Sequence, residues 1–428
     1  LHTLAMHTET NLGGTSPESM ADLYKKDGWP ADLAAINALA AVNSSEDFKA
    51  VQSAIRSLYL EWLEKGAEHF QKLIIENPLP TANKDEAFTL KSKKGCMILF
   101  ADGLRWDLAN ELSCKLKEDG FLIKLESAWA GLPSVTATAK PAVSPIAKNI
   151  KGDTPGEDFC PNLLDNGKTL TTDRFRKLLK EANCEYISPE EMGDPSISGW
   201  TEDGDLDKMG HSLQAKLVGQ IKKQIDLMRE RVSALIDAGW KEIIIVTDHG
   251  WLLLPGGLPK ISLPKYLTES RWARCASIKE GSNVDCPTVP WYWNSEKEVA
   301  VGPGISCFGK GNEYAHGGAS LQECLIPIIS VKATNRSAES NATIKEVKWV
   351  GLRCKVSVQS SGENVTVDLR TKVNDPNSSI TSPKILAEQE TVSLLVSDDS
   401  LEGSSAVIVL VNSNGEIINK QSTIIGGE

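Results

Sequence analysis

The segment that decides the fold is Cys96-Met-Ile-Leu-Phe100, which runs directly into Ala101-Asp102-Gly103. Five consecutive apolar residues are typical of a strand buried on both faces of a parallel sheet. A helix pattern follows and ends at Gly120, with apolar residues at Trp106, Ala109, Leu112 and Leu116. The order of strand, short turn and helix predicts an α/β fold and places Asp102 at the carboxyl end of a strand.

A second apolar run, Ile243-Ile-Ile-Val246, leads into Thr247-Asp-His-Gly250 in the same way. Between the two runs, apolar residues recur at spacings of three and four from Leu206 to Leu235, which predicts one long amphipathic helix. Helices that alternate with buried strands predict a mostly parallel sheet sandwiched by helices. Ligands of open α/β sheets bind at the carboxyl ends of the strands. We therefore expect Asp102 and the Asp248-His249 pair to face one crevice.

The regions on either side of the predicted α/β fold have different hydrophobic patterns. The chain has 428 residues, enough for two or three domains of ~100–200 residues each. Apolar spacings of three and four predict a helical region at 1–85, and a lysine-rich polar stretch separates it from the α/β domain at 86–332. Short β-rich runs such as Val392–Val396 predict a C-terminal all-β sandwich domain at 333–428, interpreted as a structural or interaction module.

Composition limits the class of protein. With 41% hydrophobic and 24% charged residues, the chain is typical of a soluble globular protein, and no apolar stretch approaches the ~20 residues of a membrane helix. Nine cysteines without a C-x-x-C pair predict a reduced, cytoplasmic protein. The net charge of -11 argues against broad attraction to nucleic acid, so any phosphate must be held locally. The first residue is Leu1 rather than Met, which leaves open that the chain is part of a longer protein.

Further candidate ligands lie downstream. Asp207 and His211 are spaced i, i+4 near the start of the predicted long helix, and His316 precedes two glycines. Asp203 or Asp205 could supply the carboxylate instead, and each residue taken singly has an ordinary structural explanation, such as a helix cap or a core histidine. With Asp102, Asp248 and His249, these residues form a mixed Asp and His set. Such a set suits zinc, with manganese as a possible substitute, and is about right for two ions.

A nucleophile candidate lies in Leu132-Pro-Ser-Val-Thr-Ala-Thr-Ala-Lys-Pro141. The hydroxyls of Ser134, Thr136 and Thr138 surround a predicted helix start, where backbone N–H groups favour a phosphate, although an ordinary capped helix explains the segment equally well. Arg105 follows Asp102 by one turn and could bind a phosphate oxygen or be an exposed helix residue. Two aromatic and basic segments could stack on nucleobases, although a core role is more frequent: Arg271-Trp-Ala-Arg274 and Trp291-Tyr-Trp293.

Four motifs in this order resemble the PglZ domain of the alkaline phosphatase superfamily, over roughly residues 95–332. They are Phe100-Ala-Asp-Gly-Leu-Arg-Trp-Asp107, Pro133-Ser-Val-Thr136, Val246-Thr-Asp-His-Gly250 and His316-Gly-Gly-Ala-Ser-Leu-Gln-Glu-Cys-Leu-Ile-Pro327. The resemblance implies an alkaline phosphatase-like core with two metals. One metal would be held by Asp102, Thr136, Asp248 and His249, and the other by Asp207, His211 and His316. Thr136 would be the nucleophile.

The resemblance also implies a role in phage-exclusion systems of the BREX (phage growth limitation) type, alongside other subunits of the defence complex. The resulting prediction is a cytoplasmic hydrolase with two zinc ions and no membrane association. It would act as a phosphodiesterase or nuclease on nucleic acid or nucleotides, with Arg105 binding substrate. The alternative is a non-catalytic scaffold of the same fold that binds partner proteins in the defence complex.

Overall fold

The computed structural model describes residues 1–42, 44–84, 87–333, 342–360, 365–373, 375–386, 391–412 and 415–427. Their packing forms two compact units, Leu1–Ala333 and Thr334–Glu428, and each has a hydrophobic core of its own. The predicted boundary between residues 85 and 86 lies outside the described residues. Among the described helices, none is long and apolar enough to cross a membrane.

A six-stranded sheet forms the centre of the larger unit, with strand order β2-β16-β7-β1-β6-β5. The strands are β1 (Cys96–Phe100), β2 (Phe121–Trp129), β5 (Cys184–Ile187), β6 (Ser198–Glu202), β7 (Glu242–Val246) and β16 (Leu325–Ala333). Strands β7, β1, β6 and β5 are parallel, whereas β16 runs antiparallel to both β7 and β2. Phe100 pairs with Val246, so the segments after β1 and β7 leave the sheet side by side. The predicted mostly parallel sheet is confirmed.

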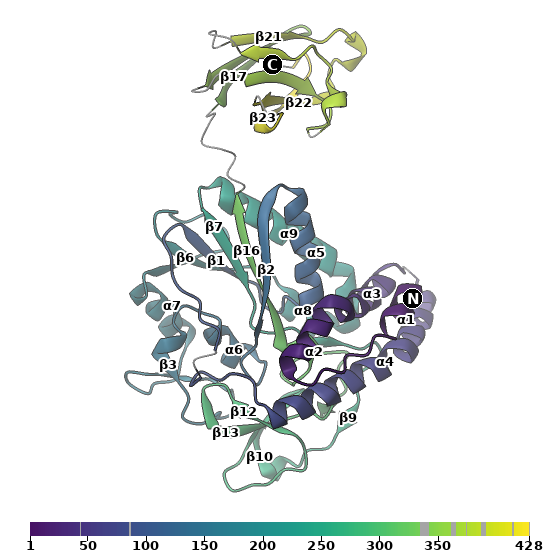
Figure 1. Ribbon diagram of the computed structural model, residues 1–428, viewed down its shortest axis with the longest axis vertical. Helices are drawn as coiled ribbons and strands as arrows, with labels where there is room; N and C mark the ends of the chain where they lie inside the picture. Colours follow the sequence, from purple (N-terminus) through teal and green to yellow (C-terminus); the bar gives the residue numbers. More distant parts are fainter. Residues whose placement is uncertain are drawn as a thin grey trace. The chain divides into compact units, whose positions relative to one another are not determined.

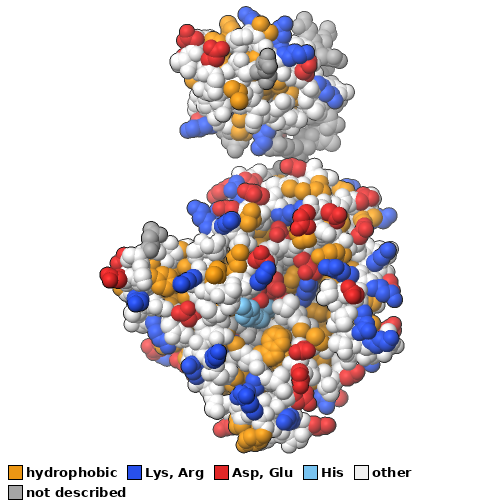
Figure 2. Space-filling view, turned by 180° about the vertical axis from the view of Figure 1, so that it is seen from behind, with side chains coloured by type: hydrophobic (Ala, Val, Ile, Leu, Met, Phe, Trp, Pro, Cys, Tyr) orange, Lys and Arg blue, Asp and Glu red, His pale blue; other side chains and the backbone are white. Residues whose placement is uncertain are grey.

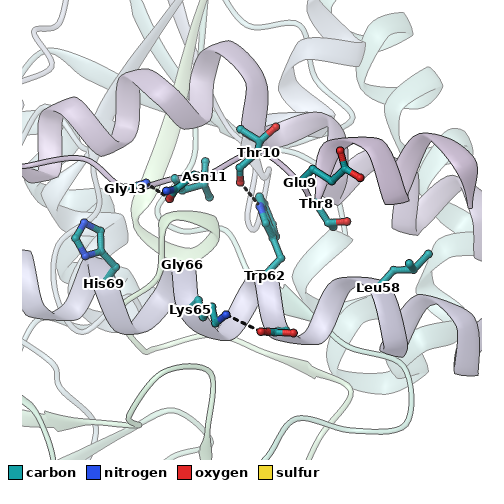
Figure 3. A pocket seen from close by; sticks show the side chains of 12 residues that line it. Thr8, Glu9, Thr10, Asn11, Gly13, Leu58, Trp62, Lys65, Gly66 and His69 are labelled. Atoms are coloured by element: carbon teal, nitrogen blue, oxygen red, sulfur yellow. Dashed lines mark hydrogen bonds and ion pairs between the residues drawn. The ribbon is translucent and has the colours of Figure 1, made fainter.

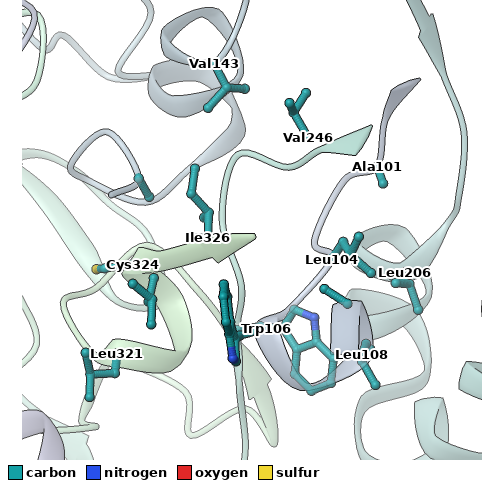
Figure 4. Close-up of a cluster of buried hydrophobic side chains, with 14 of the residues drawn as sticks. Ala101, Leu104, Trp106, Leu108, Val143, Leu206, Val246, Leu321, Cys324 and Ile326 are labelled. Carbon is teal, nitrogen blue, oxygen red and sulfur yellow. The ribbon is translucent and has the colours of Figure 1, made fainter. Parts of the chain in front are cut away.

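Helices flank this sheet (Figure 1), chiefly α5 (Trp106–Glu118), α7 (Thr172–Glu181) and α9 (Val218–Asp237), whereas the short helix α6 (Thr136–Ala142) lies beyond the ends of its strands. Helices α5 and α9 pack beside each other, and α7 packs beside β5. On α7, Phe175 and Leu179 are buried at i, i+4, and the Phe175 ring packs edge-on against Trp200 of β6. Below the strand ends, apolar side chains from β7, the start of α5 and β16 form one cluster (Figure 4).

The N-terminal segment is helical, as predicted, and shares the core of the larger unit. It comprises α1 (His2–His7), α2 (Pro17–Leu23), a π-helical turn η1 (Tyr24–Gly28), α3 (Trp29–Ala40) and α4 (Ser45–Glu76). The Ser16 side chain accepts from Ser19 N in a capping box, and Ser44 caps α4 in a similar way. Helix α3 packs against α5 and α9, so this helical layer is continuous with the helices of the sheet.

The predicted single long helix is wrong. It is divided into α8 (Leu206–Leu213), the 3-10 turn η3 (Gln214–Leu217) and α9. Gln214 has a φ of 54°, and its side-chain oxygen accepts from the backbone N–H groups of Glu313 (2.9 Å) and Tyr314 (3.1 Å). Apolar spacing continues through the break, so the sequence pattern did not reveal it. The turn gives α8, which carries Asp207 and His211, its own direction.

Between β7 and β16 the chain builds a smaller antiparallel sheet, in the order β10-β11-β13-β12. Its strands are β10 (Thr268–Arg271), β11 (Cys275–Ile278), β12 (Thr288–Trp291) and β13 (Asn294–Val301). The remaining short elements of the larger unit are β3 (Ile150–Lys151), β4 (Asn162–Leu163), β8 (Leu252–Leu253), β9 (Lys260–Ile261), β14 (Cys307–Phe308), β15 (Tyr314–Ala315), α10 (Leu321–Cys324), η2 (Ala147–Asn149) and η4 (Lys265–Leu267).

The second unit consists of two antiparallel sheets around one apolar core, which confirms the predicted all-β fold. One sheet contains β17 (Ala342–Val350), β18 (Arg353–Ser360) and β21 (Thr391–Leu395), and the other contains β20 (Lys384–Leu386), β19 (Val365–Arg370), β22 (Ser405–Val411) and β23 (Ile417–Ile424). Two 3-10 turns, η5 (Pro376–Ser378) and η6 (Asp399–Leu401), complete it.

Because the two cores are separate, we expect residues 1–333 to fold without the second unit. The truncated protein should unfold in a single cooperative thermal transition, at the temperature at which the larger unit of the full chain unfolds. A soluble truncation that shows no cooperative transition would contradict the expectation that the larger unit folds by itself. An aggregated product would contradict the predicted boundary.

Candidate metal centre

Asp102 and the Asp248-His249 pair follow the neighbouring strands β1 and β7 and lie close together. His249 Nε2 is 3.6 Å from Asp102 Oδ1 and 3.6 Å from Asp248 Oδ2. Gly103, with a φ of +73°, permits the close approach of a third carboxylate. A Cβ at this position would lie 3.2 Å from the Cβ of Asp207.

A second group contains Asp207, His211 and His316. Asp207 and His211 lie one helical turn apart on α8, with Asp207 Oδ2 3.4 Å from His211 Nε2. His316 follows β15, and its Nε2 lies 3.2 Å from Asp207 Oδ1 and 2.9 Å from His211 Nε2. The alternatives Asp203 and Asp205 do not join this group: Asp203 accepts from Gly204 N, and Asp205 is exposed.

The two groups form one continuous cluster. The rings of His249 and His316 stack with centroids 3.9 Å apart, and Asp207 lies within ligand distance of both groups. In each of two sets, Asp207–His211–His316 and Asp102–Asp207–His249, one ligand atom per residue lies within 4.8 Å of the others. The cluster reaches solvent at His211, whose side chain is 50% exposed. Figure 2 shows histidine side chains at the surface of the larger unit, with acidic side chains nearby.

The ring nitrogens are oriented as metal ligands require. His249 Nδ1 donates to the Gly250 carbonyl at 3.0 Å, and His316 Nδ1 donates to the Ser134 carbonyl at 2.9 Å. In the neutral rings, the lone pair of each Nε2 therefore points into the cluster. A backbone carbonyl that fixes the tautomer from the opposite side is the usual support of a metal-binding histidine.

Two carboxylate oxygens in the cluster are buried without a hydrogen-bond partner, Asp102 Oδ1 and Asp248 Oδ2. Burial raises the pKa of both side chains, and the Asp248 charge raises that of Asp102 further. Burial alone would lower the pKa of His249, but Asp248, Asp207 and Asp102 raise it to about 9. A bound cation would stabilise the ionised form of these buried, neighbouring carboxylates. The donor set therefore fits bound metal ions, which the orphaned oxygens would ligate.

The three candidate hydroxyls differ in their surroundings. Thr136 Oγ1, at the first residue of α6, lies 3.2 Å from His249 Nε2 and is only half-buried. Ser134 Oγ is buried and donates to the Gly318 carbonyl at 2.9 Å, while Gly317 N donates to it. Thr138 Oγ1 is buried, donates to the Phe159 carbonyl at 3.0 Å and accepts from Trp291 Nε1 at 3.1 Å. Of the three, only Thr136 presents its hydroxyl to the histidine and carboxylate cluster.

Arg105 is not the exposed helix residue that was one of its two predicted roles. Only 1% of its side chain is accessible. The guanidinium donates to both carboxylate oxygens of Asp107 at 2.7 Å and lies 4.0 Å from the centroid of the Trp251 ring. The guanidinium therefore joins the start of α5 to the segment after Asp248-His249.

Stacking on nucleobases is also wrong for the second aromatic segment. Trp291 and Trp293 are buried, and their indole N–H groups donate to the side chain and the carbonyl of Thr138. The two rings therefore pack against α6 and are bonded to it. In the first segment, Arg274 is buried as well and cannot face a base.

Sequence reasoning missed the residues that hold the His316 segment. Arg274 and Glu323 form a fully buried ion pair at 2.9 Å, and Glu323 Oε1 also accepts from Gly318 N at 2.8 Å. Gln71 of α4 donates to three backbone carbonyls, those of Gly302, Gly304 and Ala319. The one available signal was the glycine pair after His316, because a Cβ on Gly318 would lie 2.5 Å from the Arg274 guanidinium.

A separate cavity of about 580 Å³ lies between α4 and the segment after α1 (Figure 3). Three of its polar side chains have partners: Trp62 Nε1 donates to the Thr10 carbonyl, Lys65 pairs with Glu61, and His69 contacts the Gly14 carbonyl. No group like the histidine and carboxylate cluster converges among these residues, so the cluster remains the candidate site.

Comparison with curated proteins gives a match over 314 residues. The chain is 25% identical to the alkaline phosphatase-like protein PglZ of Bacillus cereus (strain H3081.97), over 65% of this chain and 34% of that protein. The match supports a PglZ-type protein. The resemblance to PglZ is therefore confirmed, and the chain spans about a third of the length of this curated relative.

No protein-family model matches the chain. Among solved structures, it is similar to murine ectonucleotide pyrophosphatase/phosphodiesterase 5, with 12% identity, 56% of this chain and 88% of that chain covered, and a TM-score of 0.35. It is also similar to phosphonoacetate hydrolase from Sinorhizobium meliloti 1021 in complex with phosphonoformate, with 11% identity, 55% and 89% coverage and a TM-score of 0.34.

Proposed function

We propose that this chain is a metal-dependent phosphoester hydrolase that uses Thr136 as its nucleophile. The observation that supports this most directly is the position of the Thr136 hydroxyl, 3.2 Å from His249 Nε2 at the edge of a cluster of three Asp and three His side chains. A half-buried hydroxyl beside such a cluster is suited to attack on phosphorus, whereas a structural hydroxyl would be engaged like those of Ser134 and Thr138.

Two metal ions, zinc with manganese as a substitute, would be held by the predicted sets. Asp102, Thr136, Asp248 and His249 would hold one, and Asp207, His211 and His316 the other. When bound, such ions supply positive charge that stabilises an alkoxide and the oxygens of a phosphoryl group. The tautomers of His249 and His316 and the orphaned oxygens of Asp102 and Asp248 support this assignment.

In the proposed reaction, Thr136 Oγ forms a bond to phosphorus as the bond to the leaving oxygen breaks. The product alcohol departs with a proton, and water then cleaves the phospho-threonine to release phosphate or a phosphomonoester. Ser134 holds the nucleophile segment to the His316 segment through Gly317 and Gly318, so that Thr136 and His316 keep a fixed separation.

The substrate class we propose is a phosphodiester, in nucleic acid or a nucleotide, and the setting is bacterial phage defence in the cytoplasm with other subunits. Motif resemblance supports the setting. Activity on bis-p-nitrophenyl phosphate, p-nitrophenyl phosphate and labelled oligonucleotides would separate diester from monoester hydrolysis. Turnover of the diester above the monoester is expected. Preference for the monoester would contradict the diester proposal, and inactivity on the whole panel would favour the scaffold alternative.

Metal binding should be measurable directly. We expect purified protein to carry up to two zinc ions per chain and to lose hydrolysis on strong chelation, with recovery on adding zinc or manganese. His316→Ala should vacate mainly the site shared with Asp207 and His211, so about one ion should remain by elemental analysis.

Metal binding should also depend on pH. Since burial raises the pKa of Asp102 and Asp248, protons compete with metal for these carboxylates, and zinc should raise the melting temperature more at pH 8 than at pH 5. A protein that neither contains nor binds these metals would contradict the proposal.

A further inference from the structure

Lys140 lies one helical turn after Thr136 on α6, so the two side chains project from the same face of the helix. Its ammonium is 2.7 Å from Glu202 Oε1 and 4.7 Å from the centroid of the Phe100 ring. Phe100 and Glu202 are register partners at the carboxyl ends of β1 and β6. The ammonium is therefore held at the sheet edge from which Asp102 emerges.

The charge of Lys140 lies near the cluster. Lys140 is on the same helix as Thr136, and its ion-pair partner Glu202 ends the strand next to the one that Asp102 follows. The side chain passes between aromatic rings, with Phe175 at 5.7 Å from the ammonium, yet 21% of it is accessible to solvent. The ammonium is thus both fixed in place and reachable by a ligand.

Two other cations near this site, Arg105 and Arg274, are buried and already paired. Arg105 is 1% exposed and bonded to Asp107, and Arg274 is fully buried and bonded to Glu323. Of these three cations, only Lys140 keeps an exposed part beside Thr136. A phosphoryl group approached by the Thr136 hydroxyl carries negative non-bridging oxygens, which a nearby ammonium stabilises.

We propose that Lys140 is a substrate-binding residue whose ammonium binds a non-bridging oxygen of the phosphoryl group. This assignment rests on the proposed function and names the chain's own contact to its substrate. Glu202 holds the ammonium when no phosphate is present, and it competes with phosphate for the same donor. Removing Lys140 should therefore weaken phosphate binding, and removing the charge of Glu202 should strengthen it.

The test uses the zinc-loaded full chain with inorganic phosphate, by calorimetry and as a competitive inhibitor of diester hydrolysis. Lys140→Met should weaken phosphate binding about tenfold or more, as expected for the loss of one charge-assisted hydrogen bond. Lys140→Arg should retain most of the affinity, and Glu202→Gln should tighten binding severalfold. Lys148→Met, which removes an exposed lysine on η2, is the matched control, and its phosphate affinity should equal that of the wild type in both measurements. Zinc content and melting temperature should be unchanged in all four variants.

Phosphate affinity within twofold of wild type in folded, zinc-loaded Lys140→Met would overturn the assignment. Weaker binding in Glu202→Gln would overturn the competition between Glu202 and phosphate. If Lys140→Met fails to fold, Lys140→Gln and the Glu202→Gln result decide. A wild-type chain that binds no metal and hydrolyses nothing would overturn the proposed function together with this assignment, whereas an active wild type with an effect-free Lys140→Met overturns only the assignment.

Discussion

Thr136→Ala is expected to lower the rate of phosphodiester hydrolysis by about 10³-fold or more while the protein stays folded. If the hydroxyl only made a structural hydrogen bond to His249, its loss would cost about 0.5–1.5 kcal/mol of stability and leave turnover intact. Loss of the nucleophile should instead appear in kcat, with zinc still held by Asp102, Asp248 and His249, though less tightly. Steady-state kinetics, elemental analysis and thermal unfolding on the same preparation separate the two cases.

The neighbouring hydroxyls provide matched controls for this experiment. Ser134→Ala should lower the melting temperature, because Gly317 N and the Gly318 carbonyl lose a buried partner, but measurable activity should remain. Thr138→Ala should behave in the same way through Phe159 and Trp291. An active Thr136→Ala beside an inactive Ser134→Ala would transfer the role to Ser134. Activity in all three variants would exclude covalent catalysis from this segment, and phage defence by folded Thr136→Ala would favour the scaffold alternative.

The strand-end residues were predictable because the fold itself places them. The carboxyl ends of parallel strands lie at the same edge of a sheet, so Asp102 after β1 and Asp248-His249 after β7 were expected at one edge once both runs were identified as buried strands. That they are also close together follows from the pairing of β1 with β7, which the structure provides. The i, i+4 spacing of Asp207 and His211 was equally informative, because one helical turn sets their separation whatever surrounds it.

Residues whose roles depend on distant partners were not predictable. Arg105 and Asp107 are two positions apart, yet their burial under Trp251 depends on the segment after β7. The residues alone left Ser134, Thr136 and Thr138 open, and only the resemblance selected Thr136. The physical reason for setting Ser134 and Thr138 aside is that the carbonyls of Gly318 and Phe159 accept from their hydroxyls, which no local pattern reveals. The break at Gln214 depends on backbone groups of β15, about a hundred residues further on, and leaves the apolar spacing unchanged.

Glu323→Ala is expected to destabilise the larger unit by about 3–5 kcal/mol, because it leaves the Arg274 guanidinium buried without its counter-ion. Glu323 also accepts from Gly318 N and from the Ser320 hydroxyl, so these groups lose their partner at the same time. Gly318 lies two residues after His316, and the segment that carries this proposed ligand should become looser. Chemical denaturation measures the first effect, and zinc titration should show weaker binding of one ion.

Two further variants distinguish an ion pair from a general loss of packing. In Glu61→Ala the exposed partner of Lys65 is removed, and the unfolding midpoint should not change measurably. In the double variant Arg274→Met with Glu323→Leu no buried charge is left unpaired, so part of the stability lost in Glu323→Ala should return. Zinc binding should not return with it, because Gly318 N still lacks its acceptor and nothing fixes the segment after His316. Recovery of both properties would show that the pair contributes only to stability, whereas recovery of stability alone would show that Glu323 positions His316 for the metal centre.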